Sequence, residues 1–258
     1  MKRSAFLKST VAMTGAACAT ATTKAATASA PEYVEIRKYL VTSPEKQAML
    51  ETYLKDAAIP ALNRVGVQQV GVFLPEKQEP KPVVYVVLRH ASLEQFAKSA
   101  ELLTDSAVGQ AGAAYLDTPA TDAIYERVES WLTRGIEGMP AVSIPAKGSQ
   151  LYQLRVYESH SEKAGKKKIE MFNMGELAIF KRCGLNAVFF GETIVGPLMP
   201  NLTYMLAFPD TAAKDQAWNT FRGDPDWAKL KATPGFTDKE IVSRITNILL
   251  VPATFSQM

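Results

Sequence analysis

A short segment of this chain occurs twice, and the two copies are 118 residues apart. Residues 32–43 read EYVEIRKYLVTS, and residues 151–161 read LYQLRVYESHS. Each copy holds an Arg and a Tyr two residues apart in a short apolar run, followed by polar residues that suit the start of a helix. Such a repeat constrains the fold strongly, because it predicts that one structural unit is built twice.

The same offset aligns other parts of the two halves. The glycines align without a gap, and the apolar runs align with a slip of one or two residues. The aligned pairs are Gly66 with Gly184, residues 83–88 with 202–208, and residues 127–132 with 244–249. The spacing predicts a duplicated unit of about 110 residues, which is too long for a solenoid repeat and suits two tandem domains.

Within each unit, segments with the alternating pattern of a strand and segments with the apolar spacing of a helix follow one another. Their order is β-α-β-β-α-β, which is the ferredoxin-like arrangement. We therefore expect an α+β protein in which two tandem ferredoxin-like units form a fold of the dimeric α+β barrel type. The expected parts are an export signal over 1–30, a diverged first unit over 31–134, a linker over 135–149 and the second unit over 150–258.

Local signals refine this expectation. Ser161 and Ser43-Pro44 each suit the start of the first helix of their unit, and Gly184 suits the end of that helix in the second unit. Asp210 suits the start of the second helical region of the second unit. Pro60 lies inside the first helix of unit one and predicts a kink there. Residues 104–122 are rich in Ala, Gly, Thr and Asp and indicate an irregular insertion.

Side chains two residues apart on a strand share a face, so both copies carry the pattern Glu/Gln-x-Arg-x-Tyr on one face. We expect the opposite, apolar face to cover the helices of its unit. The Arg–Tyr face would then line a cavity between the two sheets. The candidate ligand-binding residues are Arg37, Tyr39, Gln153, Arg155, Tyr157, Glu192 and Tyr204. The simpler interpretation is that each Arg stacks on its Tyr and pairs with Glu35 or another carboxylate.

Other chemistry-bearing residues favour structural roles. His90 and His160 have no ligand-spaced partner, so we expect ordinary surface histidines, no metal site and no cofactor. Cys183 falls on the apolar face of a helix and is expected to be a buried thiol. The run Lys166–Lys168 indicates a solvated helix face, and Asp224-Pro225 predicts the start of a helix.

The N-terminal segment has the composition of an export signal. It begins with Lys2-Arg3, contains no acidic residue and reaches the small-residue site Ala28-Ser29-Ala30. Its apolar stretch is too short to span a membrane, so we expect an exported, periplasmic or extracellular protein. Gly15 stands where a lipoprotein signal carries Leu, so we do not expect a lipid anchor at Cys18. Removing the leader leaves 25 of the 29 basic residues against 26 acidic ones, which does not favour nucleic-acid binding.

The second unit resembles the NIPSNAP family. The residues that carry the resemblance are Tyr152, Leu154, Arg155, Tyr157, Gly184, Trp218, Asp224, Pro225 and Trp227. The first unit is similar more faintly and lacks the Asp-Pro-x-Trp segment. The resemblance implies a dimeric α+β barrel with a poorly defined molecular activity, and the leader points to an exported bacterial member.

Three functions stay open from the sequence. The leading hypothesis is that a small polar or anionic molecule binds between the two sheets. The alternatives are a non-catalytic interaction or assembly module with a filled barrel, and a cofactor-independent oxygenase or isomerase. The duplication predicts either a monomer with an internal pseudo-dimer or a homodimer.

Overall fold

The structure is a computed structural model, and it describes residues 30–77, 79–102 and 108–258. The predicted export signal therefore lies outside the described residues, apart from its last residue. The first unit comprises β1 (Tyr33–Val41), α1 (Pro44–Tyr53), η1 (Leu54–Ala58), α2 (Ile59–Arg64), β2 (Gly71–Pro75), β3 (Val83–His90), α3 (Leu93–Leu102), α4 (Gly109–Leu116), η3 (Ala120–Asp122) and β4 (Tyr125–Gly135).

The second unit repeats this order. It comprises β5 (Leu151–Glu158), α5 (Glu162–Met171), η4 (Phe172–Glu176), α6 (Leu177–Arg182), β6 (Ala187–Val195), β7 (Asn201–Phe208), α7 (Thr211–Gly223), α8 (Pro225–Lys231), α9 (Asp238–Ile241) and β8 (Arg244–Pro252). Both bounds of α1, η1, α2 and β3 differ from those of α5, η4, α6 and β7 by the offset found in the sequence.

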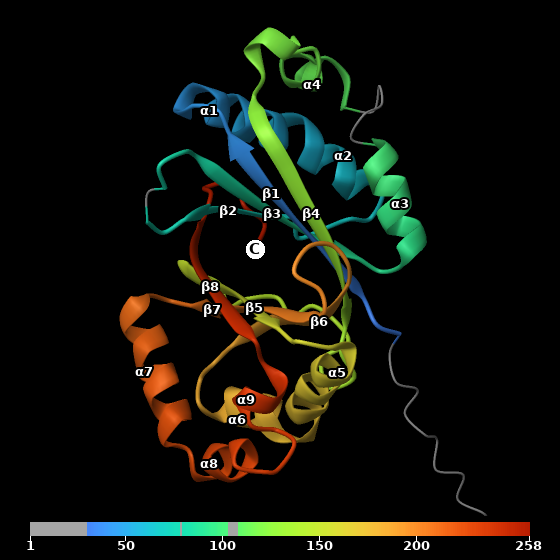
Figure 1. The fold of residues 1–258 in the computed structure, drawn as a ribbon. Coiled ribbons are helices and arrows are strands. Elements are labelled where there is room, and N and C mark those ends of the chain that lie inside the picture. Colours follow the sequence, from blue (N-terminus) through green and yellow to red (C-terminus); the bar gives the residue numbers. More distant parts are fainter. Residues whose placement is uncertain (1–29, 78, 103–107) are drawn as a thin grey trace, which may run out of the picture.

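The eight strands close into one antiparallel barrel with the order β1-β3-β2-β8-β5-β7-β6-β4. Each unit supplies four adjacent strands, and the two sheets meet where β2 pairs with β8 and where β4 pairs with β6. Figure 1 shows the helices of the first unit on one side of the barrel and those of the second unit on the opposite side. The fold is thus the expected α+β barrel built from two ferredoxin-like units.

The space between the sheets is filled by apolar side chains from both units. Ile36 and Leu154 are fully buried there, and the rings of Phe73 and Tyr152 lie 4.7 Å apart across the interior. An eight-stranded barrel has an interior just wide enough for side chains to fill. The repeated apolar face of β1 and β5 therefore points into the barrel.

The expected orientation of the Arg–Tyr face was wrong. Tyr39 packs with Leu50 and Tyr53 of α1, and Tyr157 packs with the residues of α5 and η4. Both faces of these strands are buried, so the alternation alone did not reveal which face met the helices. The Arg–Tyr face lies under the helices because the apolar residues of the opposite face fill the closed barrel interior.

The first helix of each unit is interrupted by a π-helical turn, η1 in one and η4 in the other. Pro60 lies at the start of α2, after the turn, and the second unit has the same turn without a proline. The interruption is therefore a property of the duplicated unit and not an effect of Pro60 alone. The expected irregular insertion at 104–122 contains the helix α4 over Gly109–Leu116, and its residues 104–107 lie outside the described part.

The sequence-predicted helix ends are confirmed. Ser43, Ser161 and Asp210 each accept a hydrogen bond from a backbone N–H in the first turn that follows. Gly66 and Gly184 end the first helices of the two units with φ of 81° and 80°. A residue with a Cβ adopts this left-handed conformation only at a cost, which explains the glycine at both equivalent positions.

The seam between β4 and β6 gives a direct test of barrel closure. A Cβ at Gly191 would lie 2.3 Å from Thr133 Oγ1 and 2.5 Å from Thr133 Cβ on the neighbouring strand. We therefore expect Gly191→Ala to lower the free energy of unfolding by about 1–3 kcal/mol, measured by urea denaturation. Thr133→Ala in the same chain should recover part of that loss.

Gly223→Ala is the matched control, because a Cβ there meets nothing within 4 Å. It should leave the stability unchanged or raise it slightly, since Gly223 lies in the last turn of α7. A Gly191→Ala variant as stable as the wild-type protein would show that the two strands do not approach as described.

Candidate functional site

The candidate site lies on the helix-facing side of the second sheet. Gln153, Arg155 and Tyr157 share this face of β5, and Tyr204 on β7 is paired with Arg155 across the ladder. Four of the seven sequence-predicted residues therefore come together here. They gather under the helices of the second unit and not between the two sheets.

Arg155 is surrounded by aromatic rings. Its Cζ lies 4.5 Å from the ring centroid of Trp218, 5.2 Å from that of Tyr157 and 6.0 Å from that of Tyr204. Cation–π contacts of this kind stabilise a partly desolvated guanidinium without neutralising its charge. These three aromatic rings thus hold the Arg155 guanidinium in place.

The hydrogen-bonding capacity of Arg155 is largely unused. Its Nε is buried and has no hydrogen-bond partner. Among the residues that the structure describes, no carboxylate lies within ion-pair distance of its guanidinium. A buried donor without a partner costs on the order of 1–3 kcal/mol, so such groups commonly indicate a missing acceptor.

Gln153 fixes the neighbourhood of Arg155 by two hydrogen bonds. Its Nε2 donates to Asn247 Oδ1 on β8 at 2.8 Å, and its Oε1 accepts from Trp218 Nε1 on α7 at 2.6 Å. The second bond holds the indole ring over the guanidinium and ties α7 to the sheet. Gln153 therefore acts as a neutral spacer that positions Trp218.

The two tyrosines form a short hydrogen-bonded chain. Tyr204 Oη donates to Tyr157 Oη at 3.0 Å, and the two rings meet edge to face. Burial raises the pKa of Tyr157 to about 12 and raises that of Tyr204 well above its ordinary value. Both hydroxyls are protonated at neutral pH, so Tyr157 keeps a proton to donate to another acceptor.

A buried ion pair lies beneath this group. Lys168 Nζ is 3.0 Å from Glu176 Oε2, both side chains are 2% exposed, and Lys168 also lies over the ring of Tyr157. The expectation that Lys168 belongs to a solvated face was wrong, because only Lys166 and Lys167 of that run reach the surface. The pair is neutral overall, so it leaves the charge of Arg155 uncompensated.

Glu176 lies at the end of the π-helical turn η4, which lengthens one turn of the helix. Burial raises the pKa of its carboxyl, and the charges of Lys168 and Arg155 oppose this shift. The helical turn thus brings a carboxyl with reduced acidity into the same cluster as Arg155.

The equivalent arginine of the first unit is neutralised by its own strand. Arg37 Nε donates to Glu35 Oε1 at 2.6 Å, and its Nη2 donates to Glu35 Oε2 at 3.0 Å. Ser130 donates to the same carboxylate at 2.9 Å. Glu35 corresponds to Gln153 in the repeat, so one carboxylate-to-amide difference separates a closed ion pair from an open cation.

His90 lies beside the Glu35–Arg37 pair of the first unit, so the expectation of a surface histidine was wrong. Its ring is fully buried, and Nε2 lies 3.5 Å from Glu35 Oε2. Burial by itself raises the pKa of Glu35, but His90, Arg37 and Ser130 outweigh it and hold that pKa at about 2. His160, by contrast, is exposed as expected.

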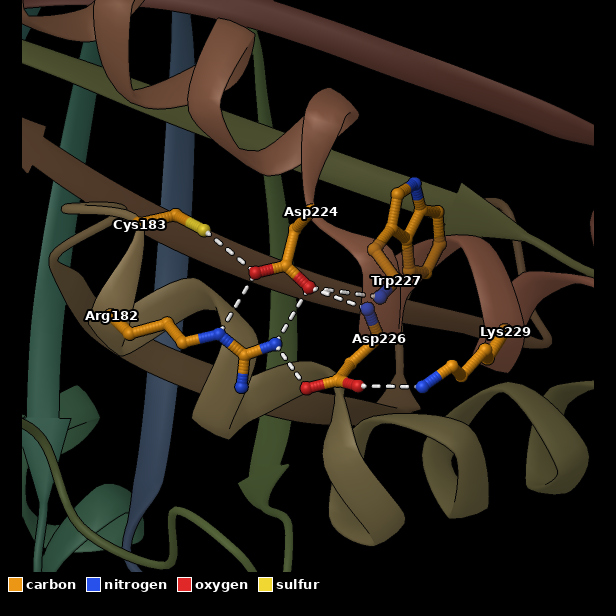
Figure 2. A network of polar contacts seen from close by, with 6 residues as sticks. All are labelled: Arg182, Cys183, Asp224, Asp226, Trp227 and Lys229. Atoms are coloured by element: carbon orange, nitrogen blue, oxygen red, sulfur yellow. Dashed lines mark hydrogen bonds and ion pairs between the residues drawn. The ribbon is translucent and has the colours of Figure 1, made fainter.

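A surface network supports the far side of the second-unit core (Figure 2). Arg182 donates to both carboxylate oxygens of Asp224, at 2.9 and 2.6 Å, and to Asp226 at 2.9 Å. Asp224 caps α8 through the backbone N–H groups of Asp226 and Trp227, as predicted from the Asp-Pro pair. The cap holds the Trp227 ring 5.8 Å from Lys168 Nζ.

Two further sequence-predicted residues lie outside the cluster. Glu192 is on β6, two strands from Arg155, and pairs with Arg134 and Lys166. Cys183 is a buried thiol at the end of α6, with a pKa raised by burial, as expected for a structural residue. Within the described residues, no three His, Cys, Asp or Glu side chains are placed to hold a metal ion.

Sequence reasoning missed several members of the cluster, namely Trp218, Asn247, Lys168 and Glu176. A signal was present for Glu176, which recurs with Phe172 and Ile179 on the apolar stripe of its helix. A carboxyl on such a stripe needs a buried partner, and Lys168 lies eight residues earlier on the same helical segment. Trp218 is among the residues that carry the family resemblance, but neither it nor Asn247 has a local signal that places it beside Arg155.

The Glu35–Arg37 pair predicts a specific acid response. The pKa of Glu35 is lowered from 4.5 to about 2, so its contribution to stability is complete above pH 4.5 and is lost as the pH falls toward 2. This loss should be on the order of 3 kcal/mol in free energy of unfolding. Glu35→Gln should remove that part of the acid dependence and lower the stability at pH 7, because Arg37 loses its counter-ion.

Urea unfolding at a series of pH values measures both effects. The control is Glu94→Gln, which removes an exposed carboxylate paired with Lys98 and should leave the acid response almost unchanged. The assignment fails if Glu35→Gln and the wild-type protein lose stability in parallel between pH 4.5 and pH 2.

Comparison with known proteins supports the fold at the level of the whole chain. A proposed monooxygenase from Fusobacterium nucleatum subsp. nucleatum aligns with a TM-score of 0.56 and 12% identity, over 86% of this chain and 93% of its own. A proposed monooxygenase from Lactobacillus acidophilus gives 0.56 and 10%, over 86% and 94%. An anthrone oxidase-like protein gives 0.50 and 11%, over 88% and 93%.

These similarities establish the α+β barrel fold and nothing more, since the identities are low. No match was found among curated proteins. The NIPSNAP family model matches residues 152–257, which include Arg155, Trp218 and the Asp224 cap. The second unit of this chain therefore matches the NIPSNAP family model, as the resemblance in its sequence indicated.

Proposed function

We propose that this protein binds a small anionic molecule at Arg155, on the helix-facing side of the second sheet. The observation that carries the proposal is the buried Nε of Arg155, which has no hydrogen-bond partner. The proposal keeps the ligand class expected from the sequence and moves the site from between the sheets to beneath the helices.

The surroundings of Arg155 favour a flat carboxylate or phenolate. A guanidinium presents its donors in a planar fork that matches a carboxylate, and charge-assisted hydrogen bonds are the stronger kind. The rings of Trp218 and Tyr157 offer stacking faces, and the Tyr157 hydroxyl supplies a further donor. An aromatic anion placed here would accept hydrogen bonds from the Arg155 guanidinium. Its ring would pack against apolar surfaces.

Access is supported by the exposure of β8. Asn247 and Ile245 pair with Arg155 and Tyr157, so they share the helix-facing side, and both are exposed. Arg155 itself is half-buried. A small ligand would approach over β8, beside α7. The first unit is not expected to bind in this way, because Glu35 already occupies Arg37.

A second candidate is cofactor-independent oxygenation of a hydroxyaromatic substrate. It is favoured by the fold shared with proteins described as proposed monooxygenases and as anthrone oxidase-like. In this reading Arg155 would stabilise the substrate anion, and the Glu176 carboxyl would lie nearby as a proton acceptor. A third candidate, an assembly module, is favoured by the apolar side chains that fill the barrel.

Benzoate is a suitable probe of the binding proposal, with Trp fluorescence and isothermal titration as readouts. Arg155→Gln should weaken benzoate binding by about 1.5–3 kcal/mol, or about 10- to 150-fold in Kd. Gln153→Glu should weaken it as well, because the new carboxylate would occupy Arg155 as Glu35 occupies Arg37. Arg37→Gln is the matched control and should lower stability while leaving the Kd unchanged.

The outcomes separate the candidates. Equal benzoate affinity in the wild-type, Arg155→Gln and Gln153→Glu proteins would refute the site. A wild-type protein that binds neither benzoate nor inorganic phosphate would favour the assembly module. Uptake of dissolved oxygen on addition of anthrone, lost in Arg155→Gln, would favour oxygenation over simple binding as the function.

Export is part of the same proposal and is supported by the composition of residues 1–30. No helix within the described ranges is long and apolar enough to cross a membrane. Expression of the full chain in a bacterium with two membranes should yield a shortened protein in the periplasm, with an N-terminus near Pro31 or a few residues before it. Full-length protein found solely in the cytoplasm would contradict export.

A further inference from the structure

A cavity of about 770 Å³ lies between the segment that joins the two units and the first helical layer of the second unit. One wall is the joining segment with Ile144 and Lys147, and the other is formed by Met174, Leu177 and Lys181. Cavities of about 300–1,000 Å³ are typical of small-molecule sites. This cavity does not contain Arg155 and is separate from the site proposed above.

The segment that joins the two units is held by hydrogen bonds at two points, one on η4 and one on β6. Gly138 N donates to Asn173 Oδ1 of η4 at 2.9 Å, and Ser143 N donates to Val188 O of β6 at 2.8 Å. A Cβ at Gly138 would lie 2.6 Å from Leu177 Cδ1, so the segment lies directly on the helix at that end. The lining of the cavity includes Gly138 and Ser143 and continues along the segment to Ser149.

The lining of the cavity is mostly apolar. Leu185 and Val188 belong to the buried core, while Ile144 and Met174 are 53% and 65% exposed. Large exposed apolar side chains in the lining of one cavity indicate a surface that an apolar group covers. The apolar part of a ligand would bury these two side chains.

The charge of the lining has one sign. Lys147 and Lys181 are its charged residues, and no Asp or Glu contributes to it. Within the described part of the chain, neither lysine forms an ion pair. A cavity with apolar walls and two unpaired cations suits a molecule with an apolar body and one negative group.

We propose that this cavity binds an amphiphilic monoanion, such as a medium-chain carboxylate. The apolar tail lies between Ile144, Met174 and Leu177, and the carboxylate interacts with Lys147 and Lys181. The site does not depend on Arg155, although Phe180 both lines the cavity and packs 5.7 Å from the Trp218 ring. It is built by the joining segment, which the first unit lacks.

The fluorescent anion 8-anilinonaphthalene-1-sulfonate and decanoate test the proposal on the full chain. The dye should bind with enhanced fluorescence, and decanoate should displace it, whereas decyltrimethylammonium should not. Lys181→Glu and Lys147→Glu should each raise the Kd of decanoate by about five- to tenfold. Ala178→Trp, at an exposed helix position in the lining, should block binding by filling the cavity.

Two controls make the result decisive. Lys163→Glu makes the same charge change at an exposed position outside the lining and should leave the Kd unchanged. Arg155→Gln should also leave it unchanged, so failure at one site is distinguishable from failure at the other. The proposal is overturned if a folded Ala178→Trp protein binds as the wild type does, if decyltrimethylammonium competes equally, or if the wild type does not bind.

Discussion

Closure of the barrel is the constraint on which the rest of this structure depends. Eight antiparallel strands surround an interior that admits side chains and little else, and apolar residues of both units fill it. The repeated arginine of each unit, Arg37 or Arg155, then lies on the helix-facing side. There it is either neutralised, as Arg37 is by Glu35, or held by rings, as Arg155 is by Trp218 and Tyr157.

The two units have kept their backbone and changed their electrostatics. The π-helical turn and the helix-ending glycine recur at the same offset. Glu35 in the first unit is replaced by Gln153 in the second, so the strand of Arg37 supplies a carboxylate partner and the strand of Arg155 does not. A duplicated fold thus gives one unit a stabilising ion pair and the other an available cation.

Much of the architecture was predictable from the sequence. The repeat, the strand order within each unit and the caps at Ser43, Ser161 and Asp210 depend on local residue types and spacing. The direction of the Arg–Tyr face was not predictable, because β1 and β5 are buried on both sides and alternation does not say which side meets helices. Distinguishing them required the partner strands and helices.

The polar cluster illustrates the same limit. Lys168 stands in a run of three lysines, and only its place on the helix, one turn before Phe172, shows that it faces the core. Its partner Glu176 carries a signal, since a carboxyl on an apolar stripe requires compensation. Trp218 and Asn247 reach Gln153 from distant segments, and such contacts follow from tertiary packing alone.

The most direct test of this account is an NMR measurement of the arginine side-chain Nε–H signals during a benzoate titration. The signal of Arg155 should shift progressively as its free donor gains an acceptor, while the signal of Arg37, already bonded to Glu35, should stay in place. A shift of the Arg37 signal, or an Arg155 signal that does not respond, would contradict the assignment of the open cation to the second unit.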